Sequence, residues 1–132
     1  MREILFRGKR IDNGEWVEGY YFCSRDLHRE YNHKIHPLDS DWSYEIDPST
    51  ISEFTGLTDK NGKKIFEGDI IKHYFSKRFS PSVGQVMFDD KNCKWLQKTI
   101  YNETWELHEG CIYEVIGNIQ DNLELLEDEY ES

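Results

Sequence analysis

A glycine-punctuated hairpin pattern most limits how this chain can fold. Asn13-Gly14 and Asn61-Gly62 each separate short stretches rich in β-branched and aromatic side chains. Asn-Gly is a strong short-range hairpin signal, because both residues tolerate the positive φ angles that a type I′ turn requires. The sequence therefore predicts two antiparallel hairpins, the first with strands at residues 2–6 and 16–23.

The two hairpins share a similar glycine pattern, in which Phe-x-Gly precedes the turn and Glu-Gly follows it, with one residue inserted before the Glu-Gly pair of the second copy. The matching residues are Phe6, Gly8, Asn13, Gly14, Glu18 and Gly19 in the first copy and Phe54, Gly56, Asn61, Gly62, Glu67 and Gly68 in the second. The match reflects either a duplication of the hairpin or the common steric need for Asn and Gly in tight turns. The pattern alone does not choose between these two origins.

Further short strands are expected beyond the hairpins. Residues 24–49 show no sustained period and are predicted to form an irregular loop with a brief strand at 44–46. Strands are predicted at residues 83–88, 93–99, 105–107 and 111–116, too closely spaced for crossover helices, which favours an antiparallel sheet and a small barrel. Asp121 is predicted to N-cap a short helix that ends at Leu126.

These elements predict a mainly β chain with three parts. Residues 1–49 form an N-terminal hairpin lobe with its loop, residues 50–126 form the small barrel with a short terminal helix, and residues 127–132 form an acidic tail. Four Trp, eight Tyr and seven Phe supply the core of this otherwise polar sequence, because each ring buries about 150 to 250 Å². Disorder along the whole chain is therefore not expected.

The expected cellular location and the net charge of the chain limit the classes of function that it can have. No apolar run of membrane-spanning length and no signal-peptide core are present in the sequence, which predicts a cytoplasmic protein with no membrane partner. Cys23, Cys93 and Cys111 form an odd set without C-x-x-C spacing, so a disulfide framework is not expected. The formal net charge is -10, which argues against nucleic-acid binding because phosphate contacts need clustered Lys and Arg.

One series of residues has the types, though not the standard spacing, of a metal site. Cys23, His28, His33 and His36 form a C-x4-H-x4-H-x2-H series inside the predicted loop. One thiolate and three imidazoles are able to bind zinc tetrahedrally. A solvated loop that happens to be rich in histidine is the alternative interpretation.

A set of short motifs extends over nearly the whole chain: Arg7-Gly8-Lys9, Gly14-x-Trp16-Val17-x-Gly19, the block at 54–70, Gly84-x-Val86, the segment 114–119 and Asp121-Asn122. In these residues the chain resembles the YopX family, small proteins encoded by bacteriophages and prophages. Ser52-Glu53 and Leu123 depart from the family's usual residues, at the edges of elements. The resemblance implies an SH3-like barrel in the second half and a phage or prophage origin in a bacterial host, but no particular biochemical activity.

The residues that form the clearest sequence pattern have a structural explanation. A turn-forming role explains Gly14, Gly19, Gly56, Asn61, Gly62, Gly68 and Asp69. No nucleophile elbow, zinc-protease helix or phosphate-binding glycine loop occurs in the sequence. The sequence therefore predicts a non-enzymatic protein without a cofactor or catalytic residues.

The aromatic residues suggest the function. Trp16, Tyr20, Trp42, Trp95 and Trp105 are candidate interaction residues, because interfaces favour such rings; the alternative is that these rings fill the barrel. We expect a protein-interaction module that binds a host or phage protein or a second copy of itself. The other hypotheses are a nucleic-acid-related protein, either a small-barrel binder or an acidic DNA mimic, and an uncharacterised enzyme.

Overall fold

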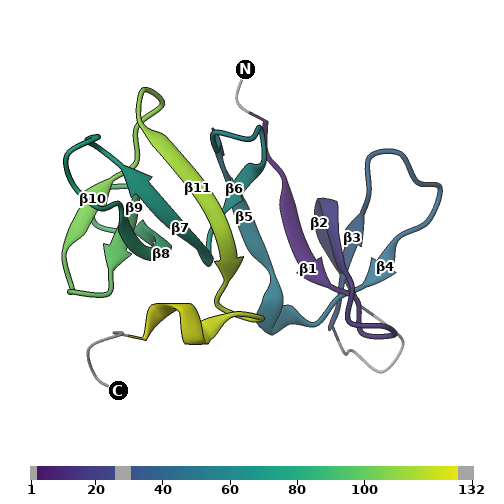
Figure 1. Cartoon of the computed structure of the whole chain (residues 1–132). Helices are drawn as coiled ribbons and strands as arrows, with labels where there is room; N and C mark the ends of the chain where they lie inside the picture. Colours follow the sequence, from purple (N-terminus) through teal and green to yellow (C-terminus); the bar gives the residue numbers. More distant parts are fainter. Residues whose placement is uncertain (1–2, 26–30, 128–132) are drawn as a thin grey trace. The chain divides into compact units, whose positions relative to one another are not determined.

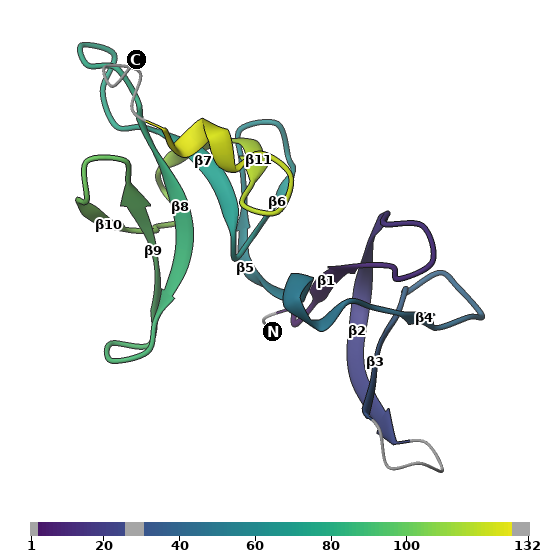
Figure 2. The same ribbon diagram turned by 90° about the horizontal axis from the view of Figure 1, so that it is seen from below.

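The computed structural model describes residues 3–25 and 31–127. The chain divides into two compact units, Met1–Phe54 and Thr55–Ser132, and the boundary falls inside strand β5. Figures 1 and 2 show short strands joined by turns in each unit. The prediction of a mainly β, antiparallel fold is confirmed.

Two antiparallel sheets contain the strands. The first has the order β4-β3-β2-β1-β5-β6 and the second the order β10-β9-β8-β7-β11. The strands are β1 (Phe6–Lys9), β2 (Trp16–Arg25), β3 (Tyr31–His36), β4 (Tyr44–Glu45), β5 (Ser52–Thr58), β6 (Lys64–Phe66), β7 (Asp69–Tyr74), β8 (Ser82–Asp89), β9 (Lys94–Thr99), β10 (Thr104–Glu106) and β11 (Ile112–Asn118). Two 3-10 turns, η1 (Pro48–Thr50) and η2 (Leu123–Leu126), are the helical elements of the described residues.

Both glycine-spaced hairpins form, but neither uses the expected type I′ turn. That turn needs positive φ at two successive residues, and here Gly14 (φ 72°) and Gly62 (φ 79°) adopt it while the preceding asparagines do not. In the second hairpin, Gly62 N–H donates to the Asp59 carbonyl oxygen at 3.0 Å and Asp59 N–H donates to Lys63 at 2.8 Å. These bonds define a three-residue loop that ends in a left-handed glycine.

Two predictions about the first unit were wrong. The first strand lies at Phe6–Lys9 instead of residues 2–6, because its pairing with β2 continues to Lys9 and Trp16, closer to the turn than predicted. The predicted irregular loop at 24–49 contains a full strand, β3. This strand pairs with β2, with His36 opposite Tyr20 and Tyr31 opposite Arg25 at the two ends of the ladder. Residues of low β propensity form this strand because the ten-residue β2 offers a pairing edge.

The core of the first unit is apolar. Leu5, Ile35 and Ile46 are almost completely buried, Phe54 is buried as well, and Thr50 is the buried polar residue among the residues described there. Ile35 lies on the same side of the sheet as Tyr21, its register partner. The opposite side of β1, β2 and β3 therefore faces solvent.

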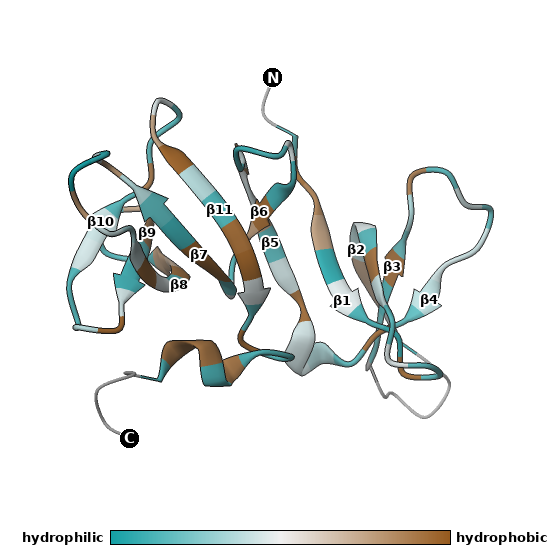
Figure 3. Ribbon diagram, viewed as in Figure 1, coloured by the Kyte–Doolittle hydropathy of each residue, from teal (hydrophilic) through white to brown (hydrophobic). Residues whose placement is uncertain are grey.

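The sheet of the second unit is open but strongly curved. Strands β7 and β10 are three places apart in the sheet, which is about 14 Å along a flat sheet. The rings of His73 on β7 and Trp105 on β10 nevertheless lie with their centroids 6.4 Å apart. The sheet therefore bends around a core of Ile65, Ile71, Val86, Leu107 and Tyr113, and Figure 3 shows hydrophobic segments on β7, β8 and β11.

Polar side chains are buried inside this second core. The Gln97 amide donates to the carbonyl oxygens of Ile71 and Ser82, both at 3.0 Å, and accepts from the Ser82 hydroxyl. Asp69 accepts from Phe66 N–H at 2.8 Å, directly after Gly68 (φ 84°). These bonds satisfy buried groups and fix the entry to β7.

A buried carboxylate joins the second hairpin to strand β11. Asp59 accepts from the N–H groups of Asn61 and Lys63 at one oxygen and of Val115 at the other, all at 2.9 Å. Burial raises the pKa of Asp59, but these backbone donors and the nearby lysine outweigh burial, so the net pKa is lowered. The hairpin and the β11 edge are therefore connected by an ionised group.

The short C-terminal helix is a single 3-10 turn, Leu123–Leu126, without buried residues. Asn122, not Asp121, precedes it, and no side chain caps it. Asn122 instead accepts from Asn118 N–H at 3.2 Å, and Asp121 accepts from the Asn118 amide at 3.2 Å. Because both side chains bond back to Asn118, neither is available to start a longer helix.

Candidate interaction surfaces

The solvent-facing side of β2 presents a row of aromatic side chains. Alternate residues of a strand point to the same side, so Trp16, Tyr20 and Phe22 share this face. Tyr20 is 59% exposed and Phe22 is 40% exposed. We call this surface of β1, β2 and β3 the aromatic face.

Cations from β1 cover the first ring of the row. The Arg7 guanidinium carbon lies 4.7 Å and the Lys9 ammonium 5.3 Å from the centroid of Trp16. Arg7 also donates to the Ser52 hydroxyl at 3.2 Å. Trp16 is therefore half-buried beneath two cations, which stabilise its position.

Strand β3 adds polar residues to the same face. The register places His36 opposite Tyr20 and Lys34 opposite Phe22, with Glu45 of β4 opposite Lys34. The His36 Nδ1 atom lies 2.9 Å from the Ser43 hydroxyl. Two exposed rings thus lie next to a lysine and a histidine held in place by the loop before β4.

Trp42 lies in that loop and is 74% exposed. Its backbone N–H donates to the Ser40 hydroxyl at 3.0 Å. The indole ring of Trp42 therefore contributes little to the core of the first unit.

The structure separates the described members of the predicted metal series. Cys23 and His33 are register partners, whereas His36 lies three residues further along β3 and so points to the opposite side of the sheet. The His33 Nδ1 atom lies 2.6 Å from the Tyr21 hydroxyl, and the two rings stack. His28 lies outside the described residues, and the described ones contain no group of three His, Cys, Asp or Glu placed to hold a metal.

The two predicted tryptophans of the second unit differ in position. Trp95 is half-buried, packs against the core and meets Phe88 edge to face at 4.9 Å. Trp105 is 40% exposed and lies 5.5 Å from Phe75, measured between ring centroids. Trp95 therefore belongs to the core, whereas Trp105 belongs to an aromatic cluster at the surface.

The loop between β7 and β8, residues 75–81, exposes two aromatic residues for which no role was predicted from the sequence. Phe75 is 48% exposed and Phe79 is 68% exposed, and Lys77 and Arg78 lie between them. A sequence signal was available, because residues 70–88 contain no Asp or Glu although 26 of the 132 residues are acidic. The net charge of the whole chain is negative and therefore does not reveal this locally basic segment.

A buried histidine lies beneath the loop. The His73 ring is 5% exposed, and neither ring nitrogen has a hydrogen-bond partner. It meets Phe75 edge to face at 5.0 Å and Tyr113 at 4.9 Å. Burial, followed by the nearby His108, lowers the pKa of His73, so the ring is neutral near pH 7.

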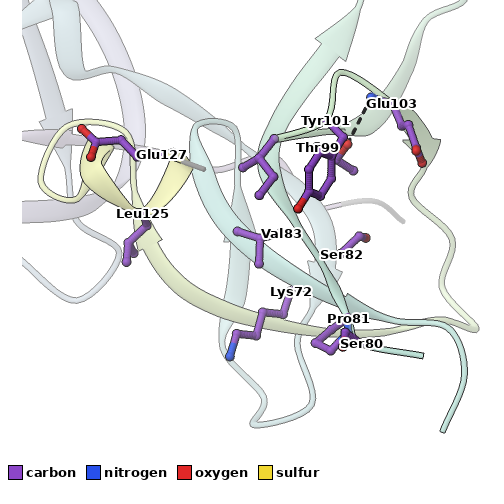
Figure 4. A pocket seen from close by; sticks show the side chains of 11 residues that line it. Lys72, Ser80, Pro81, Ser82, Val83, Thr99, Tyr101, Glu103, Leu125 and Glu127 are labelled. Atoms are coloured by element: carbon purple, nitrogen blue, oxygen red, sulfur yellow. Dashed lines mark hydrogen bonds between the residues drawn. The ribbon is translucent and has the colours of Figure 1, made fainter. Parts of the chain in front are cut away.

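A separate pocket of about 480 Å³ opens beside η2 in the second unit (Figure 4). Its apolar lining comes from Pro81, Val83, Ile100 and Leu125, and its polar groups include Lys72, Glu103 and Glu127. Glu103 N–H donates to the Thr99 hydroxyl at 3.1 Å, which orders one wall. The volume lies in the range of small-ligand sites, but charges of both signs surround it.

The family model for the YopX protein matches residues 5–127. The chain belongs to the YopX family. The match spans nearly the whole chain, so the family predicted from the resemblance is confirmed.

A solved structure of protein EF1440 from Enterococcus faecalis is similar to this chain. The two are 21% identical with a TM-score of 0.49, and the alignment covers 96% of this chain and 100% of that one. A search of the curated proteins finds no match. Among the described residues, no helix is long and apolar enough to cross a membrane.

Proposed function

We propose that this YopX protein is a non-enzymatic protein-interaction module, and that the aromatic face of the first unit binds its partner. The proposed partner is a host or phage protein in the cytoplasm of a bacterium, and the role is accessory or regulatory. The observation that carries the proposal is the exposure of Tyr20 and Phe22 on a strand whose other side packs on the core.

The chemistry of the aromatic face fits a protein interface. Interface cores are enriched in aromatic residues and arginine, and Arg7, Trp16 and Tyr20 supply these types on adjacent strands. Paired strands present the rings with little freedom to lose on binding. A ring exposed for no purpose would add to the risk of aggregation.

We also infer that the second unit is a small barrel of the SH3-like kind. Its five antiparallel strands and the short distance between the rings of His73 and Trp105 support this inference. A crystal structure would test it, because a barrel requires the ends of the curved sheet to approach each other, and a gap between β10 and β11 that exposes the core would contradict it.

The proposed function is tested with a double variant, Tyr20→Ser/Phe22→Ser. Affinity capture from host lysate identifies partners that the wild-type chain retains, and each is then purified and titrated calorimetrically against both chains. Because both side chains are exposed, we expect an unchanged fold and at least about tenfold weaker binding, as for interface hot spots.

The matched control is Ile11→Ser/Leu38→Ser, which removes two other exposed apolar side chains of the first unit. The control should bind as the wild type does. Equal binding by wild type and the Tyr20/Phe22 variant would contradict the proposal. Light scattering of the purified chain tests the alternative of a second copy, since self-association through this face would be lost in the same variant.

A further inference from the structure

The β7–β8 loop lies in a locally positive part of an acidic chain. Residues 70–88 carry Lys72, Lys77 and Arg78 and no carboxylate. Lys77 and Arg78 are both exposed. Exposed charges act over about 10 Å at moderate salt, so a ligand near the loop experiences these cations more strongly than the chain's net charge of -10.

Two phenyl rings flank these cations. Phe79 is 68% exposed. The Phe75 ring packs against two other rings. Its centroid lies 5.0 Å from that of His73, which it meets edge to face, and 5.5 Å from that of Trp105. Because these neighbours support the Phe75 ring while leaving 48% of the residue exposed, it offers a fixed apolar surface to a flat ligand group.

A pocket of about 390 Å³ lies beside the supported ring. It is lined by Lys60, Tyr74, Phe75, Ser76, Lys77 and Ile112. The pocket combines apolar walls with two ammonium groups, which suits a ligand that is both flat and anionic.

One of the two ammonium groups is already positioned. The Lys60 ammonium lies 5.0 Å from the Tyr74 ring centroid and 3.6 Å from the Glu114 carboxylate. The Tyr74 hydroxyl donates to the same carboxylate at 2.8 Å. Glu114 therefore contacts two residues that line this pocket, and because its carboxylate is already engaged by them, it weakens anion binding only in part.

We propose that the β7–β8 loop binds single-stranded nucleic acid, with bases stacked on Phe75 and Phe79 and phosphates paired with Lys60, Lys77 and Arg78. Stacking on aromatic side chains combined with a cationic path is the way single strands are bound without sequence preference. A duplex keeps its bases stacked on one another and cannot use the two rings. An acidic peptide would satisfy the cations but leave the rings without a flat partner.

This inference goes beyond the proposed protein interaction, because it concerns another surface in the other unit. It also explains how a chain with a net charge of -10 can bind a polyanion. Affinity depends on the local cluster of Lys and Arg that releases counterions, not on the sum over the whole chain.

The test is a titration of the full chain into a fluorescently labelled thymidine oligonucleotide of about 16 nucleotides, within the site sizes of known single-strand binders. We expect saturable binding at low salt, and with three phosphate contacts a slope of log affinity against log salt of about -2. The duplex of the same length should bind more weakly. Absence of binding at low salt, or equal binding of the duplex, overturns the proposal.

Two variants separate the rings from the cations. Phe79→Ser removes an exposed ring and should weaken binding by about tenfold or more, the usual cost of losing one stacked base. Lys77→Glu/Arg78→Glu should weaken binding more than Phe79→Ser does and reduce the slope of log affinity against log salt, because two of the three phosphate contacts are lost. The matched charge control, Lys91→Glu/Lys98→Glu, alters exposed lysines outside the loop and should change the affinity by less than about threefold.

Competition with an acidic polymer tests whether base stacking contributes to oligonucleotide binding. Polyglutamate of similar charge should displace the oligonucleotide poorly. If polyglutamate competes as well as unlabelled oligonucleotide, or if Phe79→Ser binds as the wild type does, the loop is a charged surface without base stacking and the proposal is wrong. Because Tyr20→Ser/Phe22→Ser leaves this loop unchanged, that variant should bind the oligonucleotide normally, which keeps this test independent of the proposed protein interaction.

Discussion

The first unit buries mainly apolar side chains, whereas the second unit also buries several polar and ionisable ones. Among the described residues, the first core is formed by Leu5, Ile35, Ile46 and Phe54. The second core includes Asp69, His73 and Gln97 in addition to its apolar cluster. We therefore expect the stability of the second unit to depend on pH and on individual hydrogen bonds, and the stability of the first unit to depend on packing.

The two hairpins differ in the same way. The second loop is fixed by the buried Asp59, whereas the first is fixed at the surface, where Arg10 and the exposed Asp12 form an ion pair. Their glycines differ as well. Gly19 has no room for a Cβ atom, because that atom would overlap the backbone of His36 and Pro37, whereas Gly68 at the matching position is required for its positive φ.

The largest expected effect is on the second hairpin. Asp59→Ala leaves three backbone N–H groups without their acceptor and should destabilise the second unit by about 4 kcal/mol. Urea denaturation measures the loss, and hydrogen exchange assigns it to a unit. The control Asp12→Ala removes an exposed ion pair and should change little. Equal effects of the two variants would refute the contrast between the loops.

The next largest expected loss of stability concerns two glycines of the first hairpin, one required for close packing and the other for its positive φ. Gly19→Ala forces the backbones of β2 and β3 apart and should cost about 3 kcal/mol. Gly14→Ala meets open space and only a positive φ, so it should cost about 1 kcal/mol. Gly14→Asn should recover part of that cost, since Asn adopts the left-handed region more readily. A Gly19→Ala variant as stable as wild type in thermal melts would show that the close approach is relaxed in solution.

The third effect is confined to alkaline pH and to the second unit. Burial, with the nearby Cys111 thiol, raises the pKa of Tyr113 to about 12, against an opposing effect of His108 N–H. The folded state therefore holds its proton where the unfolded state loses it, and stability falls as pH rises above the ordinary value of 10. Tyr113→Phe should show a shallower loss in chemical denaturation between pH 8 and about 11. An unchanged slope would contradict the assignment.

The smallest expected effect is a loss of stability of the second unit at mildly acidic pH. The lowered pKa of His73 means that the unfolded state binds a proton more readily than the folded state, so stability falls as pH drops below the ordinary histidine value of 6.5. His73→Leu should remove part of this loss, measured in the second unit between pH 7.5 and about 5.5. The lowered pKa of Asp59 contributes only below its ordinary value of 3.8, which keeps the two groups distinguishable. A matching pH response in the first unit would contradict the contrast between the cores.

The sequence analysis predicted the mainly β, antiparallel fold and the family, both of which are confirmed. It missed β3, because Asn32, His33 and Lys34 carry no strand signal of their own. It also treated Trp16, Tyr20, Trp42, Trp95 and Trp105 as one set. The structure distributes these residues over two units and a range of burial, because exposure depends on which side of a paired strand each residue occupies.

Features that depend on neighbouring residues can be predicted from the sequence. Positive φ favours glycine in any surroundings, so the roles of Gly14 and Gly62 follow from the local sequence. The pairing of the strands, the need for Gly19 and the position of the Asp59 charge arise only in the folded chain. Folding also places Lys60 at the pocket beside the β7–β8 loop. Space, burial and electrostatic environment are created by residues that are distant in the sequence, so a local pattern does not contain them.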